Sequence, residues 1–170
     1  MTSTEILTGE RADLLETLRQ HRWFLTFTAQ GLTDEQAAAS PTDSALCIGG
    51  LIKHVALVEE KWVRFIEHGT EAMAPSEADY ADHAASFRME PGETLAGIIE
   101  RYNAVAAYTD KLVESVDLDV AHLLPPAPWF PEGKTRSARR VLMHIVAETS
   151  QHAGHADIIR ETIDGQKTMG

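Results

Sequence analysis

Apolar residues recur at helical spacing along most of the chain, and this periodicity constrains the fold more than any other feature. Between residues 48 and 68, five large apolar side chains follow at intervals of four, three, four and three residues: Leu51, Val55, Val58, Trp62 and Phe65. This spacing places them on one face of an α-helix. Alternating, strand-like segments are hard to find, so the sequence predicts an all-α protein.

Four long helices are predicted, separated by recognisable stop signals. They cover about residues 8–30, 48–68, 92–116 and 137–163. Gly31, Gly69 and Gly165 end the first, second and fourth of them. A capping box at residues 33–36 predicts a short helical turn that Pro41 ends. We therefore expect an antiparallel four-helix bundle, and a length of 170 residues suits a single domain over residues 1–170.

Two connections between the predicted helices are long. Residues 70–91 are rich in Ala, Glu, Asp, Ser and Pro, and we interpret them as an acidic crossover connection between helices that need not be neighbours. Residues 124–133 contain four prolines. They cannot be helical, because proline lacks the amide donor and restricts the residue before it. A stiff aromatic loop is expected there.

Charge and cysteine content limit the classes of partner. Lys and Arg number 15 against 26 Asp and Glu, and the formal net charge of −11 repels nucleic acid and favours a cationic or metal partner. No secretion signal and no apolar run of about 18 residues occur, so we expect a cytoplasmic protein without membrane contact. The single cysteine, Cys47, cannot form an internal disulfide and is expected to be a small buried residue. Any metal would therefore be held by His and carboxylate ligands.

The fourth predicted helix carries ionisable residues where its periodicity predicts core positions. Steps of four, three, four, three and four residues from Val141 reach Ile145, Glu148, His152, His155 and Ile159. Burying ionisable groups without partners is costly. Glu148 and His152 lie one turn apart on the same face, about 6 Å along the axis, so both can reach one metal ion about 2 Å from each ligating atom.

His54 is the third candidate ligand, because it flanks the apolar stripe of the second helix, which a bundle can place opposite the fourth. A hydrogen-bonded core histidine is the competing interpretation for each of these residues. His144 and His152 lie about 12 Å apart along the helix, too far for both to join Glu148 as direct ligands. The sequence thus predicts one divalent metal ion at His54, Glu148 and His152. Zinc is expected, and Ni, Fe and Mn accept the same ligand types.

Two other groups flank this predicted site. Trp129 and Phe130 belong to the proline-rich loop before the fourth helix, and they either roof a pocket or pack on the end of the bundle. Near the start of that helix stand three arginines: Arg136, Arg139 and Arg140. An ordinary solvated basic face is the simpler interpretation of these arginines, and an anion site is the alternative.

Three segments carry a family resemblance over nearly the whole chain. They are Gly-Gly-Leu-Ile-Lys-His-Val at 49–55, Gly-Leu-Thr-Asp-Glu-Gln at 31–36, and the stretch His-Ile-Val-Ala-Glu-Thr-Ser-Gln-His-Ala-Gly-His-Ala-Asp-Ile-Ile-Arg-Glu at 144–161. The sequence resembles the DinB/YfiT-like family, particularly its actinobacterial branch of mycothiol transferase-like proteins. This resemblance implies a four-helix bundle with three metal ligands, which fall here on His54, Glu148 and His152.

The order His, Glu, His also resembles the metal site of the mycothiol-dependent maleylpyruvate isomerases. Those enzymes carry a second, carboxy-terminal domain, for which no counterpart follows the fourth predicted helix, and this weakens an isomerase assignment. Relatives in the family are often dimers, so the resemblance implies a homodimer as one form of assembly.

The ligand set and the resemblance together predict metal-dependent S-transfer. Two imidazoles and one carboxylate leave one coordination position open, as in catalytic zinc sites. The resemblance implies a small-molecule thiol, mycothiol, which would attack an electrophilic co-substrate as a thiolate. His155, one turn after His152, is expected to orient a ligand or move a proton. The alternatives are a metal-dependent hydrolase, a non-catalytic stress-related metal-binding protein, and a helical interaction protein that uses the stripe as a dimer seam.

Overall fold

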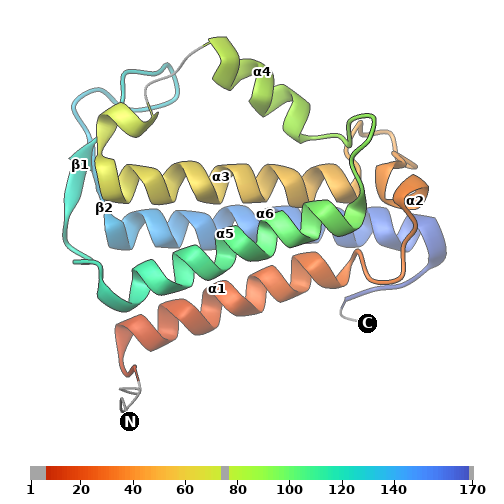
Figure 1. Ribbon diagram of the computed structural model, residues 1–170, viewed down its shortest axis with the longest axis horizontal. Helices are drawn as coiled ribbons and strands as arrows, with labels where there is room; N and C mark the ends of the chain where they lie inside the picture. The colour runs from red at the N-terminus through yellow and green to blue at the C-terminus, as the bar shows by residue number, and fades with distance from the viewer. Residues whose placement is uncertain (1–6, 74–76, 169–170) are drawn as a thin grey trace.

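The computed structural model describes residues 7–73 and 77–168, and for residues 77–80 only the backbone. Four long helices form the bundle that the periodicity predicts (Figure 1). They are α1 (Glu10–Phe27), α3 (Ile48–His68), α5 (Leu95–Ser115) and α6 (Ala138–Asp164). The short α2 (Asp34–Ala38) follows the predicted capping box, in which the Thr33 side chain accepts from the Gln36 amide and the Gln36 side chain accepts from the Thr33 amide. The all-α class is confirmed.

The helix bounds differ from the predicted ones by a few residues at some ends. The first helix stops at Phe27, because the chain turns over the next residues before Gly31. The third starts at Leu95 and not near residue 92, because the Thr94 side chain accepts a hydrogen bond from the Gly97 amide and so caps the helix there. Ends of this kind depend on single side-chain hydrogen bonds, which periodicity does not report.

The crossover connection decides how the four helices run. Lys53 pairs with Glu93, and Tyr108 donates to Glu67 two turns before the end of α5, so α3 and α5 lie side by side in the same direction. Arg160, near the end of α6, donates to the carbonyl of Thr28 after α1, so these two helices are also parallel. Antiparallel packing joins α3 to α6 and α1 to α5. The predicted crossover is confirmed, and it makes two neighbouring pairs parallel.

The crossover itself is more ordered than the sequence indicates. It contains a 3₁₀ turn (Thr70–Met73) and α4 (Glu77–Ser86), a helix that the periodicity does not predict. Among the side chains of α4 that the structure describes, residues 81–86, the first four are exposed and only Ser86 is buried. With so little burial, these six residues show no apolar stripe to detect. In Figure 1, α4 stands above α3 and leads back toward the start of that helix.

A small hairpin lies at the end of the bundle opposite α2 (Figure 1). Strands β1 (Ala121–Leu123) and β2 (Thr135–Ser137) pair antiparallel, with His122 opposite Arg136. The sequence does not predict this pair, because three residues are too few to show an alternating pattern. The strands enclose the predicted proline-rich loop, which is not helical.

The core consists of two apolar clusters with polar residues at the level between them. One cluster includes Ile48, Leu51 and Val55, and the other includes Trp62, Phe65 and Val141. On α1 and α3 the level between them is occupied by Arg22 and Glu59, whose ion pair is 2.5 Å long and almost fully buried. On α6 the same level carries Glu148 and His152. No helix in the described part of the chain has the length and apolarity needed to span a bilayer.

Candidate metal centre

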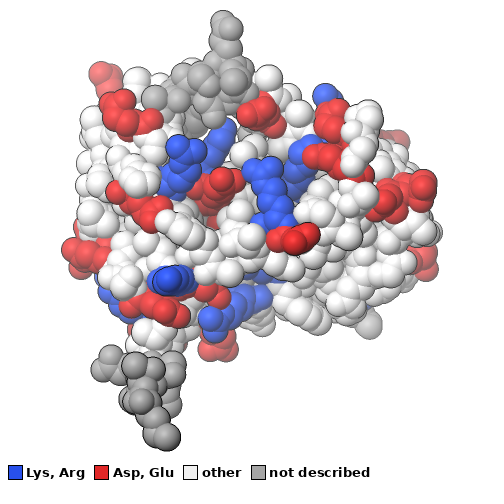
Figure 2. Space-filling model, viewed as in Figure 1, with Lys and Arg blue, Asp and Glu red and all other residues white. Residues whose placement is uncertain are grey.

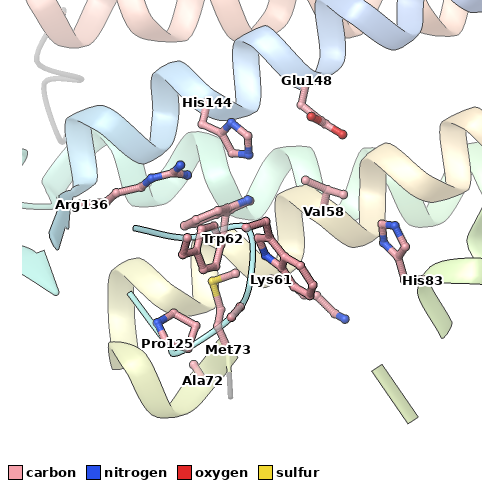
Figure 3. A pocket seen from close by; sticks show the side chains of 13 residues that line it. Val58, Lys61, Trp62, Ala72, Met73, His83, Pro125, Arg136, His144 and Glu148 are labelled. Carbon is pink, nitrogen blue, oxygen red and sulfur yellow. The ribbon is translucent and has the colours of Figure 1, made fainter. Parts of the chain in front are cut away.

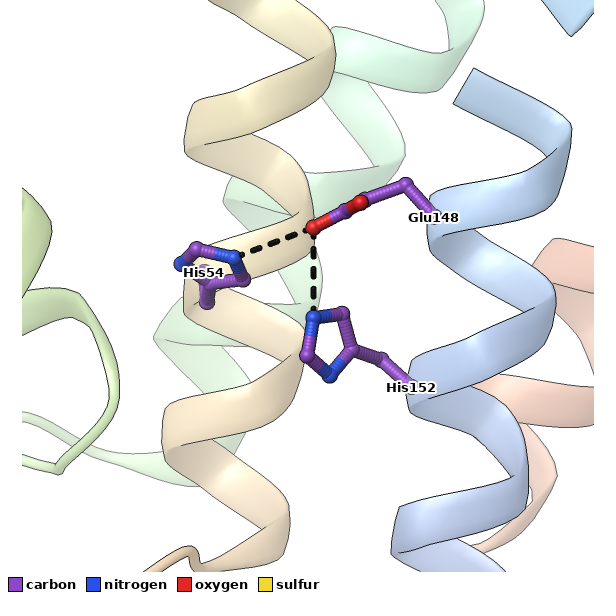
Figure 4. A group of neighbouring side chains, drawn as sticks. All are labelled: His54, Glu148 and His152. Carbon is purple, nitrogen blue, oxygen red and sulfur yellow. Dashed lines mark hydrogen bonds and ion pairs between the residues drawn. The ribbon is translucent and has the colours of Figure 1, made fainter. Parts of the chain in front are cut away.

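The bundle brings together the three residues that the sequence predicts as ligands. His54 comes from α3, and Glu148 and His152 come from one face of the antiparallel α6 (Figure 4). One donor atom from each lies within 4.8 Å of the other two. The Glu148 Oε1 atom is 3.4 Å from His54 Nε2 and 3.2 Å from His152 Nε2. Ligand atoms about 2.1 Å from a tetrahedral ion lie roughly 3.4 Å from one another, so this spacing fits one small divalent cation.

Ser86 determines which nitrogen of His54 faces the site. The Ser86 hydroxyl donates to the carbonyl of His83 at 2.6 Å, and its oxygen lies 2.9 Å from His54 Nδ1. Since the single hydroxyl proton is used on the carbonyl, the oxygen accepts a hydrogen bond from the Nδ1–H of His54. In the neutral imidazole the Nε2 atom then carries a lone pair and no proton. This is the arrangement of a metal-ligating histidine with a fixed tautomer.

The acceptor atoms around Glu148 also fit a cation between them. The lone pair of His54 Nε2 faces a carboxylate oxygen at 3.4 Å, and two acceptors at this distance repel each other. A proton or a metal ion between them removes the repulsion. The hydrogen bond that His152 donates holds the pKa of the Glu148 carboxyl far below its usual range. The Glu148 carboxylate is therefore anionic at neutral pH, as a metal ligand of this type must be.

His155 lies against the outer side of His152. The Nδ1 atoms of the two rings are 3.4 Å apart, so one of them donates and the other accepts. When His152 offers its Nε2 lone pair to a cation, its Nδ1 carries the proton and donates to His155 Nδ1. His155 is thus in contact with a candidate ligand and is absent from the group of three that can hold the ion.

The crossover forms a wall of the site directly over α3. The Phe87 ring stacks on the His54 ring with centroids 3.9 Å apart. A Cβ atom on Gly50 would lie 2.0 Å from the carbonyl oxygen of Phe87, and one on Gly49 would lie 2.3 Å from the Met89 sulfur. The glycine pair lets the crossover reach α3 and so brings Ser86 to His54. In the sequence this pair is only part of the family resemblance, and neither Ser86 nor Phe87 carries a signal of its own.

A pocket of about 510 Å³ extends from Glu148 along α3 and α6 (Figure 3). Its lining is largely apolar and aromatic, with a few ionisable residues: Val58, Lys61, Trp62, Ala72, Met73, His83, Pro125, Ala127, Trp129, Phe130, Arg136, His144 and Glu148. Burial lowers the pKa of His144 and of His83, with a smaller contribution from the positive charge of nearby residues. Both imidazoles are therefore neutral at pH 7.

The structure separates the remaining candidates. Trp129 and Phe130 of the proline-rich loop both line the pocket, and Phe130 also packs against Trp62. His144 packs edge-on against Trp62 with ring centroids 5.0 Å apart, and it does not belong to the group of three. His83 is exposed but also lies edge-on to His54, with ring centroids 5.1 Å apart.

Comparisons with known proteins agree with this fold. No curated protein matches the sequence. A solved structure, described as the conserved protein of a locus from Enterococcus faecalis, superposes with a TM-score of 0.69 at 15% identity, covering 94% of this chain and all of that one. At this identity the likeness shows the fold alone. The family model described as mycothiol-S-transferase matches residues 13–165. The chain therefore belongs to the mycothiol-S-transferase family, within the DinB/YfiT-like proteins.

Proposed function

We propose that this protein is a metal-dependent S-transferase, in which His54, Glu148 and His152 hold one divalent ion, zinc by preference. The observation that carries the proposal is the position of Glu148, which belongs both to the group of three donors and to the lining of the 510 Å³ pocket. A substrate in the pocket is thus next to the donor group. Family membership favours a small-molecule thiol, and mycothiol is the thiol we propose.

When bound, the ion would supply a Lewis acid that keeps a substrate thiol ionised at neutral pH. The chain supplies the rest. Ser86 holds the His54 ring so that Nε2 points into the site, and His155 orients His152 through the contact between their Nδ1 atoms. In the transfer, the thiol sulfur forms a bond to an electrophilic carbon, and the leaving group departs with the electron pair of the bond that breaks. We assign His155 as the residue that holds the proton at His152 Nδ1.

The apolar wall of the pocket supports transfer between two organic substrates. Trp62 and Phe130 provide aromatic surface beside the donor group, which suits the apolar body of an electrophile and excludes water from a thiolate. We propose that residues 1–170 act as one domain, located in the cytoplasm.

The proposal is tested first by metal content. Elemental analysis of untagged wild-type protein should give near one equivalent of metal, and His152→Ala should lose it. Gln151→Ala, an exposed neighbour on the same helix, is the matched control and should keep the metal. The loaded protein is then mixed with mycothiol and 1-chloro-2,4-dinitrobenzene, and the thioether product is measured by mass. Metal bound without any product would support the non-catalytic alternative. Cleavage of an ester, offered in a separate assay, without thioether formation in the first would support the hydrolase.

A further inference from the structure

We propose that Arg136 binds a carboxylate group of the electrophilic co-substrate, so that the enzyme selects anionic electrophiles over neutral ones. Arg136 lines the pocket next to the candidate metal centre. Its Nη1 atom is buried and has no hydrogen-bond partner among the described residues. A buried donor without a partner is costly in a folded protein, and a bound anion is the partner that a guanidinium best accommodates. The inference deepens the proposed function and rests on it for assigning the pocket to a substrate.

The surroundings of Arg136 hold its guanidinium in place without satisfying it. The Cζ atom lies 4.7 Å from the centroid of the Trp62 ring and 5.5 Å from that of Phe130. Stacking of this kind fixes the plane of the guanidinium and does not use its N–H donors. Burial, and then the positive charge of Arg140, lower the pKa of Arg136, so an anion in the pocket would relieve both effects.

The neighbouring arginines show that this placement is specific to Arg136. All three arginines near the start of α6 are described by the structure. Arg139 pairs with Glu10 and Asp119 on the bundle surface, outside the pocket. Arg140 is exposed and does not line the pocket. Arg140 therefore fits the interpretation as a solvated basic residue, which the sequence favours. Arg136 fits the alternative interpretation as part of an anion site.

The layout of the pocket indicates how such a substrate would lie. In Figure 3, Arg136 and Glu148 are at opposite ends of the labelled side chains on α6 and β2, with His144 between them. A carboxylate at Arg136 therefore directs the rest of the molecule over Trp62 toward the donor group. Among the described residues that line the pocket, Glu148 is the only carboxylate, and it lies at the far end from Arg136.

The charge of the whole protein makes this local arrangement necessary. With a net charge of −11 the chain repels anions on average. On the face in Figure 2, basic side chains near the middle stand beside acidic ones, and further acidic side chains are spread toward the edges. An anionic substrate needs such a local cation to enter, and Lys61 lines the pocket together with Arg136.

The test uses a pair of probes that differ in charge and share one shape. Binding of 4-methylbenzoate and of neutral 4-methylbenzamide is measured by isothermal titration calorimetry on metal-free wild type, Arg136→Gln and Arg140→Gln. The two variants remove the same charge within five residues of each other. We expect Arg136→Gln to weaken benzoate binding at least about tenfold and to leave the amide unchanged, whereas Arg140→Gln changes both less than about twofold.

Three outcomes would overturn the proposal: equal affinity of wild type for the two probes, equal weakening of both by Arg136→Gln, or an equal effect of the two variants on benzoate. Circular dichroism spectra that superpose for all three proteins exclude misfolding as the cause. The assay needs neither metal nor thiol, so its failure leaves the S-transferase proposal standing. Conversely, if the loaded protein proves to have no transferase activity, the metal-free protein should still bind the benzoate more tightly than the amide.

Discussion

Replacing Ser86 with alanine should weaken metal binding although Ser86 is not a ligand. The hydroxyl is the acceptor for His54 Nδ1 at 2.9 Å, and both side chains are almost fully buried, with 1% and 2% of their surfaces exposed. Its loss leaves the Nδ1–H without a partner, at a cost of about 1–3 kcal/mol. It also frees the ring to turn or change tautomer. Loss of such an outer partner typically lowers metal affinity about 10- to 100-fold, or by about 1.4–2.7 kcal/mol.

The assay is competition for Zn²⁺ against a chromophoric chelator at pH 7, with Ser150→Ala as the control. Ser150 is exposed on α6, beside the ligands in sequence, so the same chemical change should leave the affinity within about twofold of wild type. A Ser86→Ala protein that folds normally and binds Zn²⁺ as tightly as wild type would show that Ser86 does not position His54. His54 would then not be held in the tautomer with its proton on Nδ1 by this hydroxyl.

Three further predictions concern the scaffold, each measured by urea unfolding of the metal-free protein. Gly50→Ala should destabilise the protein, because the new Cβ would lie 2.0 Å from the carbonyl oxygen of Phe87. Gly154→Ala meets nothing within 4 Å and should stabilise α6 by about 0.5–1 kcal/mol. Equal effects of the two variants would contradict the close approach of the crossover to α3. The lowered pKa of Glu148 contributes stability that is present above about pH 4.5 and is lost as the pH falls further. In Glu148→Gln the free energy of unfolding should therefore fall less steeply with acidification than in wild type. Glu59→Gln should cost about 1.5–3 kcal/mol, because buried Arg22 loses the charge of one of its two carboxylate partners and keeps only Asp110, and a cost below about 1 kcal/mol would refute this.

The sequence predicts the parts of the site that lie on regular helices. Glu148 and His152 are recognisable because their spacing of four residues places them on one face among apolar neighbours. His54 is visible as a polar residue flanking an apolar stripe. The pairing of the two helices follows from their antiparallel packing in a bundle, which the resemblance also implies. That these three residues lie together is thus predictable, and their function as metal ligands stays a proposal.

The contacts that tune the site could not be predicted from one sequence. Ser86 and Phe87 lie on the crossover, where residues 81–84 of its helix are all exposed, so no periodicity marks them. Their position depends on Gly49 and Gly50, which allow the close approach, and a glycine pair alone does not say what approaches it. Arg136 differs from Arg139 and Arg140 only through the hairpin, whose three-residue strands leave no pattern.

The parallel arrangement of α1 with α6 has a consequence for how the protein folds. These two helices are far apart in sequence, and the bond from Arg160 to Thr28 spans 132 residues. An up-and-down bundle can assemble from hairpins of helices that are neighbours in sequence. Here α1 packs in parallel on α6, the last of the four long helices, so this pair cannot form until the rest of the bundle has been made. Such non-local closure slows folding. On a ribosome, α1, α3 and α5 would therefore expose apolar surface until α6 emerges, and the candidate metal centre would form in the same late step.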